Sequence, residues 1–534
     1  MVEHYLDRLA RTINENWDSP ALTDFYLTEY GTEQDTSRGN HYTYGEMYGE
    51  ILRLGGLFNE LGLQKGDHIA ICGANSAHWA IVYLAIAAYQ GVVVTVLHSQ
   101  LPEDIAHQID FSDAKALFTD IELWDELKSQ SLPKLEHVIS LDKWQILHGR
   151  EIRIINHKSK IINRDCHFSH GEPDDLAMIC FTSGSTSGSK GVMLSYRSLS
   201  ANIAYTQKNI PTHVGRNEVC SLPLAHIFSL TIEFLYQVAG GTHVYFIPRM
   251  SSAALFKAYA VAKPCMIMTV PFVLERMFAA NVFPALERPI IKCIWHMPIV
   301  CKSIEKKLYQ QLQQAFGGNV KWLITGGAAV NPKVEQIFRR IEFPFVVGYG
   351  MTEAGPLICY DEWFDEVQGC CGKVVDLCEL TIQSDDPLAQ DGEILFRGEH
   401  LMSGYYKDKE STRRRIDANG WFHTGDVGHL DFAGRLFITG RLEQDMIVLP
   451  NGENIHPEDI ERKINALPEV KESIVLARDG KLVAIVVADT DIRRRVLRTI
   501  NPELPLYSQL YDVEITDVPL QKTEKQTLKR YLYK

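Results

Sequence analysis

The sequence lacks the features that mark several classes of protein. Its eleven cysteines form no C-x-x-C pair of the zinc-binding type, and their odd, sparse number does not fit a secreted disulfide framework. Basic residues are in the minority, since 54 Lys and Arg face 67 Asp and Glu, and the net charge of −13 argues against a nucleic-acid-binding protein. With 46% hydrophobic and 23% charged residues, the composition is that of a globular protein rather than a disordered one.

One apolar run, residues 78–97 (HWAIVYLAIAAYQGVVVTVL), is about as long as a membrane span. Gln90 and Gly91 interrupt it, and β-branched residues follow. We therefore expect a buried helix, a turn and a buried strand, with a transmembrane helix as the weaker alternative. The N-terminal sequence MVEHYLDRLARTINENW has no apolar stretch of the signal-peptide type. We expect a cytoplasmic protein with at most peripheral membrane contact.

The length of 534 residues predicts two to four domains. Short apolar runs alternate with helical patterns, which predicts an α/β fold of mixed and parallel sheets packed against helices. We expect a large N-terminal domain over residues 1–440, with a β-rich subdomain at about 370–440, and a small α+β domain over 441–534. The predicted strands of the large domain are 68–72, 92–97, 178–182, 242–247, 322–325, 380–383, 392–397 and 434–439. The small domain is predicted as strand, helix, strand, strand, helix, over 446–449, 457–466, 470–477, 482–489 and 492–500.

A segment rich in Gly, Ser and Thr, TSGSTSGSKG, covers residues 182–191 and follows an apolar strand. Such a loop lets backbone N–H groups converge on an anion, and Lys190 adds a positive charge for a phosphate. It is not a Walker P-loop, because that pattern needs Gly directly before Lys, and here Ser189 precedes Lys190. By itself, such a run is more typical of a flexible turn.

A second segment, GYGMTEAGP at residues 348–356, follows an apolar run and is predicted at the end of a strand, where α/β sheets bind ligands. The carboxylate of Glu353 is suited to holding Mg²⁺ together with phosphate oxygens. The hydroxyl of Thr352 is suited to a phosphate, and the ring of Tyr349 to stacking on a purine. The alternative is a turn with a capping threonine and a solvated glutamate.

A third segment, residues 420–441 (GWFHTGDVGHLDFAGRLFITGR), places Asp426 in a predicted tight turn. A fixed carboxylate can accept hydrogen bonds from both hydroxyls of a ribose, and Arg441 can reinforce that edge or neutralise a phosphate. Alone, such an aspartate is an ordinary turn residue. A fourth segment, residues 451–461 (NGENIHPEDIE), predicts a tight turn followed by a helix.

In this order and spacing, the four segments resemble the motifs of the adenylate-forming superfamily, which includes acyl-CoA and aryl-CoA synthetases, peptide-synthetase adenylation domains and luciferases. The resemblance spans most of the chain. It points to the long-chain fatty acyl-CoA synthetase branch through LPLAH at 222–226, ITGGA at 324–328 and IVLPNGENI at 447–455. It implies that ATP and a carboxylic acid, here a medium- or long-chain fatty acid, give an acyl-adenylate and pyrophosphate. Coenzyme A then displaces AMP.

The resemblance also implies roles for individual residues. Glu353 and Thr182 are expected to hold Mg²⁺, and Thr352 to contact the α-phosphate. Lys190 and the loop before it are expected to hold the β- and γ-phosphates. His226 resembles an aromatic gate beside the acid site, with a packed core histidine as the alternative. The residues expected to bind the nucleotide are Thr182, Ser183, Gly184, Ser185, Thr186, Lys190, Gly326, Gly327, Ala328, Tyr349, Gly350, Thr352, Asp426 and Arg441, the last two at the ribose.

The sequence departs from the family's pattern near its C-terminus. The family carries there, within P-x-T-x-x-G-K-I-x-R, a lysine that binds the reacting carboxylate, whereas residues 521–530 read QKTEKQTLKR. Aligning the first threonine and the final arginine puts Thr527 at the lysine position, and Lys525 and Lys529 are the candidates to replace it. The family's small C-terminal domain is mobile and rotates about a hinge, for which Asp445 is the candidate.

Three hypotheses follow from these observations. The leading one is an ATP- and Mg²⁺-dependent ligase that joins a fatty acid to coenzyme A. The second is an enzyme that passes the acyl group to a carrier protein, which would be a separate protein because the sequence contains no recognisable carrier domain. The third is a non-catalytic nucleotide-binding relative, which only the unusual segment 521–530 supports.

Overall fold

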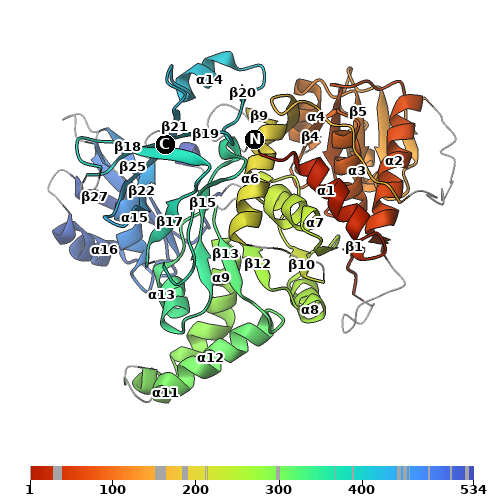
Figure 1. The fold of residues 1–534 in the computed structure, drawn as a ribbon. Coiled ribbons are helices and arrows are strands. Elements are labelled where there is room, and N and C mark those ends of the chain that lie inside the picture. Colours follow the sequence, from red (N-terminus) through yellow and green to blue (C-terminus); the bar gives the residue numbers. More distant parts are fainter. Residues whose placement is uncertain are drawn as a thin grey trace. The chain divides into compact units, whose positions relative to one another are not determined.

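Figure 1 shows the computed structural model of the chain with the labels used below. Backbone contacts divide the chain into two compact units. The first consists of Met1–Thr182, Lys190–Glu379 and Arg397–Arg414, and the second of Ser183–Ser189, Leu380–Phe396 and Arg415–Lys534. The predicted boundary at residue 441 stays a prediction. The residues that the structure describes are 2–27, 39–100, 102–150, 164–182, 190–210, 212, 215–295, 297, 301–365, 367–387, 390–441, 447–448, 454–455, 457–478, 481–504, 508–522, 528 and 530–533.

An eight-stranded sheet in the first unit has the order β20-β9-β8-β4-β3-β5-β6-β7. Its centre is parallel, since β3 pairs in parallel with β4 and β5, and β4 with β8. Nearly all residues of these strands are apolar and buried, as expected where helices cover a parallel sheet. The strands are β3 (His68–Cys72), β4 (Val92–Thr95), β5 (Ala116–Thr119), β6 (His137–Ser140), β7 (Ile146–His148), β8 (Leu176–Thr182), β9 (Lys190–Ser195) and β20 (Gly404–Tyr405).

The apolar run at 78–97 is divided between a helix and a strand, as predicted. Helix α3 (Ala77–Ala88) is buried on every side over its first eleven residues, and a turn leads from it into β4. Its lack of a polar face explains why the run resembles a membrane span. In the described part of the chain, no helix combines the length and the hydropathy that crossing a membrane requires. The other helices of this region are α1 (Tyr5–Glu15), α2 (Tyr44–Glu60), α4 (Pro102–Phe111), α5 (Ile121–Leu127) and α6 (Tyr196–Asn209).

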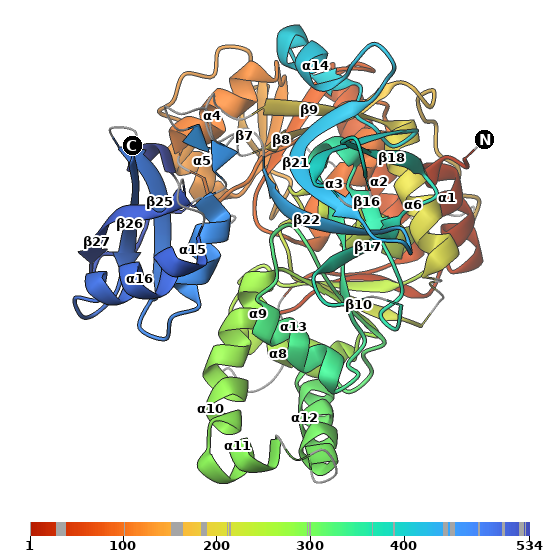
Figure 2. The same cartoon turned by 90° about the vertical axis from the view of Figure 1, so that its left-hand side faces the viewer.

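Two smaller sheets extend the core of the first unit. One has the order β10-β11-β1-β2, and the other is the parallel sheet β12-β13-β14. Beside the second, a bundle of short helices forms an arm at the bottom of both views (Figures 1 and 2). The strands are β1 (Pro20–Asp24), β2 (His41–Thr43), β10 (Asn217–Cys220), β11 (His243–Phe246), β12 (Met266–Thr269), β13 (Trp322–Thr325) and β14 (Phe345–Val347). The helices are η1 (Ser229–Leu235), α7 (Tyr236–Ala239), α8 (Ser252–Ala262), α9 (Pro271–Met277), η2 (Phe278–Val282), α10 (Phe283–Leu286), α11 (Pro289–Trp295), α12 (Cys301–Ala315) and α13 (Pro332–Arg340).

Short antiparallel strands follow, as the β-rich prediction requires. In the first unit, β16 pairs with β15 and with β17, and in the second unit β21 pairs with β19 and with β22. The elements are β15 (Tyr349–Gly350), η3 (Thr352–Ala354), β16 (Leu357–Tyr360), β17 (Cys370–Val374), β18 (Cys378–Gln383), β19 (Gly392–Gly398), α14 (Lys409–Arg415), β21 (Phe422–Leu430) and β22 (Arg435–Arg441).

The C-terminal part of the second unit is an α+β fold with its own core. Apolar side chains of two helices pack on the sheet β25-β26-β27. The predicted strands and helices occur in the predicted order, and β24 and β27 are additional strands that the sequence analysis does not identify. The elements are β23 (Ile447–Val448), β24 (Asn454–Ile455), α15 (Pro457–Asn465), β25 (Glu472–Arg478), β26 (Lys481–Val487), α16 (Arg493–Ile500), η4 (Asn501–Glu503), β27 (Leu510–Thr516) and η6 (Arg530–Leu532).

Candidate active site

The strands on either side of the predicted phosphate loop form an antiparallel pair. Thr182 ends β8, Lys190 begins β9, and the two residues are direct partners in the register. The two residues predicted to flank the phosphate loop therefore lie side by side. Ser183, Gly184, Ser185 and Thr186 lie outside the described residues, and their roles stay predictions.

Two further predicted segments meet at the carboxyl ends of neighbouring parallel strands. Gly326 follows β13 and Gly348 follows β14, and a Cβ atom on Gly326 would lie 2.9 Å from the carbonyl oxygen of Gly348. A Cβ atom on Gly350 would lie 1.9 Å from the carbonyl oxygen of Pro356, so only glycine permits this close turn. The structure thus brings ITGGA and GYGMTEAGP together at the edge where α/β sheets bind ligands. Gly327, Ala328, Thr352 and Tyr349 lie in the same two segments, Tyr349 with its side chain buried.

A tyrosine that the sequence analysis does not identify links Glu353 to Lys190. The hydroxyl of Tyr405 donates a hydrogen bond of 2.8 Å to Oε1 of Glu353. Nζ of Lys190 lies 4.9 Å from the centre of the Tyr405 ring, which is a cation–π contact. Strand β20 causes this placement, because it pairs Tyr405 with Val192 in β9. A carboxylate and an ammonium group thus contact the same aromatic side chain.

Helix α6, which directly follows β9, fixes the turn that carries Glu353. The buried side chain of Asn202 donates to the carbonyl of Ala354 and accepts from the backbone N–H of Leu357, both at 3.1 Å. The backbone N–H of Met402 donates to the carbonyl of Glu353 at 2.8 Å. The carboxylate is therefore presented from a backbone that is held on both sides.

His226 lies in the loop between β10 and η1, and its side chain is half-buried. The hydroxyl of Thr95 and the thiol of Cys180 both donate to the carbonyl of Ala225, at 3.1 and 3.4 Å. Since Cys180 precedes Thr182 by two residues in β8, this loop lies against the strand that leads into the phosphate loop. The role of His226 beside the acid site stays a prediction, and so does the alternative of a packed histidine.

The two residues predicted at the ribose are direct partners in the second unit. Asp426 in β21 and Arg441 in β22 face each other in the antiparallel register, so the two positions are neighbours across the pair of strands. The predicted tight turn at Asp426 is wrong, because the residue lies within β21 and is 3% exposed. Its backbone N–H donates to the hydroxyl of Thr424 at 2.9 Å. Asp445, the candidate hinge, lies outside the described residues.

Arg530 holds the end of the segment that replaces the family's lysine motif. Its guanidinium donates to both carboxylate oxygens of Glu461 in α15, at 2.5 and 2.6 Å, and to the carbonyl of Val475 in β25 at 3.2 Å. The final arginine of the motif is thus a structural residue. Lys525 and Lys529 lie outside the described residues, so their catalytic role stays a prediction.

Comparison with known proteins identifies the family. A family model described as AMP-binding enzyme matches residues 9–406. The chain belongs to this family. Long chain acyl-CoA synthetase 7, peroxisomal, of Arabidopsis thaliana is 29% identical over 85% of this chain and 69% of the relative. 4-Coumarate–CoA ligase 1 of Petroselinum crispum is 26% identical over 90% of this chain and 86% of the relative.

This AMP-binding enzyme also has the fold of solved members of the superfamily. The ATP-bound structure of MatB from Rhodopseudomonas palustris superposes with a TM-score of 0.79, covering 99% of this chain and 98% of that one at 21% identity. The prediction of an adenylate-forming fold is therefore confirmed. The family and the curated relatives together support an adenylate-forming acid–CoA ligase.

Glu353 of this AMP-binding enzyme fits a magnesium site that depends on the substrate. No cluster of three or more His, Cys, Asp or Glu side chains within the described ranges could hold a metal ion by itself. Mg²⁺ is usually bound by one or two carboxylates together with substrate phosphates. A carboxylate offers about four acceptor positions, and the hydroxyl of Tyr405 occupies one on Glu353. The assignment of Glu353 and Thr182 to Mg²⁺ stays a prediction.

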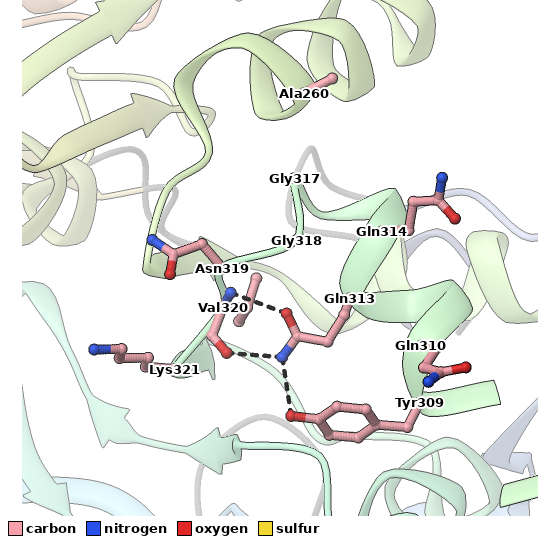
Figure 3. A pocket seen from close by; sticks show the side chains of 10 residues that line it. All are labelled: Ala260, Tyr309, Gln310, Gln313, Gln314, Gly317, Gly318, Asn319, Val320 and Lys321. Carbon is pink, nitrogen blue, oxygen red and sulfur yellow. Dashed lines mark hydrogen bonds between the residues drawn. The ribbon is translucent and has the colours of Figure 1, made fainter. Parts of the chain in front are cut away.

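A hollow of about 680 Å³ elsewhere in the AMP-binding enzyme contains none of the predicted site residues (Figure 3). It lies between α12 and the turn before β13. The side chain of Gln313 donates to the carbonyl of Val320 at 2.8 Å and accepts from the N–H of the same residue at 3.0 Å. It also donates to the hydroxyl of Tyr309 at 3.2 Å. These bonds tie the turn to the helix, so the polar lining has a structural purpose.

Proposed function

We propose that the protein is an ATP- and Mg²⁺-dependent ligase that converts a medium- or long-chain fatty acid into its acyl-adenylate and then into acyl-CoA. The observation that carries the proposal is the Glu353–Tyr405–Lys190 arrangement at the end of the phosphate-loop strands. It brings the carboxylate that we propose for Mg²⁺ and the ammonium group that we propose for the phosphates to the same aromatic side chain. Family membership supports the same reaction.

In the first half-reaction, a carboxylate of the fatty acid attacks the α-phosphorus of ATP, and pyrophosphate leaves. Catalysis of such a step is mainly positioning and stabilisation of charge on the phosphate oxygens. Lys190 supplies fixed positive charge for the β- and γ-phosphates. Glu353 would hold Mg²⁺, which neutralises charge on the phosphates. Thr352 is proposed at the α-phosphate. Asp426 and its register partner Arg441 are proposed at the ribose.

In the second half-reaction, the thiol of coenzyme A attacks the acyl carbonyl, and AMP leaves. The fatty acid as substrate is supported by the LPLAH and ITGGA segments and by the similarity to a protein named long chain acyl-CoA synthetase. The similarity to a 4-coumarate–CoA ligase makes aromatic acids the competing substrate class. A cytoplasmic location and coenzyme A as the acceptor belong to this proposal.

We expect purified protein with ATP, Mg²⁺ and coenzyme A to release AMP and form acyl-CoA from fatty acids of some chain length, and to react slowly with 4-coumarate. Mass spectrometry of AMP, acyl-adenylate and acyl-CoA is the measurement. Preference for 4-coumarate would overturn the fatty-acid assignment. Acyl-adenylate without acyl-CoA would indicate a carrier protein as the acceptor. Nucleotide binding without AMP release from any acid would indicate a non-catalytic relative.

Tyr405→Phe is expected to lower the rate of adenylate formation about tenfold or more, with a smaller change in the KM of ATP. The phenylalanine ring still contacts Lys190, but the charged carboxylate of Glu353 no longer receives a hydrogen bond from a hydroxyl at position 405. Tyr406→Phe is the matched control. Tyr406 is the next residue in the chain, and its hydroxyl donates to Asp113 at 2.6 Å rather than to Glu353. ATP–pyrophosphate exchange measures the rate of adenylate formation and the KM of ATP for both variants. Equal rates for the two would show that Tyr405 does not position Glu353.

A further inference from the structure

The loop that carries His226 is held from inside the first unit by one acidic side chain. Glu233, in η1, is fully buried. Its Oε1 accepts from the N–H of Ser221 at 3.3 Å and from the hydroxyl of Ser221 at 3.2 Å. Its Oε2 accepts from the N–H of Leu222 at 3.1 Å and from the hydroxyl of Ser229 at 2.6 Å. Donors from the start of the loop and from the helix thus converge on a single carboxylate.

Neutral side chains hold the rest of the same loop. The amide of Asn75 donates to the carbonyl of Leu222 at 2.7 Å and accepts from the N–H of Leu224 at 2.8 Å. The hydroxyl of Thr95 and the thiol of Cys180, both in the large sheet, donate to the carbonyl of Ala225. Asn75, Thr95 and Cys180 bond the backbone of the loop as neutral groups, whereas Glu233 bonds it through a carboxyl group that can ionise. The loop is therefore sensitive to charge at its beginning, at Glu233.

A second buried carboxyl group lies on the strand that precedes the loop. Glu218 in β10 accepts from the side-chain amide of Gln237 at 3.4 Å, so its bond is to helix α7 rather than to the loop. Burial raises the pKa of Glu233 to about 7, and the hydrogen bonds from Ser229, Leu222 and Ser221 offset part of that rise. Burial also raises the pKa of Glu218, to which the charge of Glu233 adds. The other titratable groups that act on this pair are Arg216, Cys220, Tyr236, Tyr259 and Cys265.

We propose that Glu233 is a positioning residue of the acid site, which fixes the backbone at Ser221 and Leu222 and thereby sets the place of His226 beside the carboxylic acid. The placement of His226 beside a carboxylic acid rests on the proposed function, whereas the anchoring of Ser221 and Leu222 does not. The ionised form can accept from the two N–H groups, and it competes for the hydroxyl hydrogens of Ser221 and Ser229 with the carbonyls of Met268 and Leu222. A neutral Glu233 can instead donate to the hydroxyl of Ser221, whose single hydrogen then goes to the carbonyl of Met268 at 3.0 Å. The neutral carboxyl group is a weaker acceptor for the N–H groups of Ser221 and Leu222, so the loop is held less firmly.

Three variants test the proposal. Glu233→Gln imitates the neutral side chain, since its amide group can donate to the hydroxyl of Ser221. Glu233→Ala removes the anchor. Glu218→Gln is the matched control, because it replaces a buried carboxyl group on the adjacent strand, whose bond goes to Gln237 rather than to the loop. The measurements are the separate KM values of the acid and of ATP between pH 6 and pH 8.5, and hydrogen exchange of peptides that cover residues 219–228.

In the wild type, the KM of the acid is expected to rise about threefold to tenfold as the pH falls through about 7, while the KM of ATP changes little. Glu233→Gln is expected to show the higher value at every pH. Glu233→Ala is expected to raise the KM of the acid by about tenfold or more and to speed hydrogen exchange in the loop. Glu218→Gln is expected to leave loop exchange as in the wild type.

Equal effects of Glu218→Gln and Glu233→Gln would overturn the proposal, because replacing any buried carboxyl group of this region would then explain them. A KM of ATP that rises as much as that of the acid would also overturn it. If Glu233→Ala does not fold, Glu233→Gln carries the test. Hydrogen exchange needs no turnover, so unaltered exchange in Glu233→Gln at pH 8 rejects the anchor even where the wild type activates no acid. Failure of the proposed function is recognised separately, as absence of AMP release by the wild type.

Discussion

Glu353→Gln is expected to lower formation of the acyl-adenylate at least about a hundredfold and to leave the fold intact. The amide has nearly the size of the carboxylate and still accepts the hydrogen bond from Tyr405, so the local packing is preserved. It is neutral, however, and Mg²⁺ prefers charged oxygen ligands beside the phosphates. ATP–pyrophosphate exchange at saturating ATP measures the loss, and thermal unfolding checks the fold.

Glu305→Gln is the control for this experiment. Glu305 on α12 is also a half-buried glutamate of the first unit, and it pairs with Arg340 at 2.7 Å away from the predicted site residues. Its loss should leave exchange near the wild-type rate. If high concentrations of Mg²⁺ restore part of the activity of Glu353→Gln, the assignment of Glu353 as a ligand of Mg²⁺ is strengthened. If Glu353→Gln releases AMP at the wild-type rate, this assignment is excluded.

The strands that carry the site could be predicted because their sequence pattern is local. The strand predicted at 322–325 is β13, and the segment at 348–356 does follow a strand, β14. Parallel strands must end at a common edge, so two glycine-rich segments after apolar runs are expected to meet there. The approach of Gly326 to Gly348 is the result. Local pattern and sheet geometry suffice for this part of the site.

Tyr405 and Glu233 could not be predicted in the same way. Tyr405 reaches Glu353 across 52 residues of sequence, because β20 pairs with β9. A two-residue strand has no periodic signal. Glu233 lies in a mostly apolar helix, where the sequence gives no sign that donors of Cys220, Ser221 and Leu222 would point at its carboxylate. Both roles come from tertiary contacts alone.

Asp426 shows the opposite error, since a local signal was misleading. Gly425, Asp426 and the glycine at 428 have the composition of a turn, yet the chain continues as β21. The pair β21–β22 tolerates the glycines through a shift of register between Val427 and Gly428. The register puts Asp426 opposite Arg441, and the role of both residues at the ribose stays a prediction.

Breaking the pair of Glu461 and Arg530 is expected to destabilise the second unit by about 3–5 kcal/mol, since one buried charge is left without its partner. The two side chains are only 7% and 10% exposed, and they join α15 to the C-terminal segment through two hydrogen bonds. Glu461 also accepts from the N–H of Val475 at 2.6 Å. Hydrogen exchange of α15 and β25 in increasing urea measures the second unit apart from the first.

The double variant Glu461→Gln with Arg530→Met should cost less than the sum of the two single variants, because it leaves no unpaired charge. Glu514→Gln is the control, since its pair with Arg478 is 48% and 38% exposed and should contribute less than about 1 kcal/mol. Additive single effects would show that the two side chains do not act as a pair. Arg530 ends the segment that contains Lys525 and Lys529, so if either lysine binds the reacting carboxylate, Arg530→Met must also slow adenylation under conditions in which the protein stays folded.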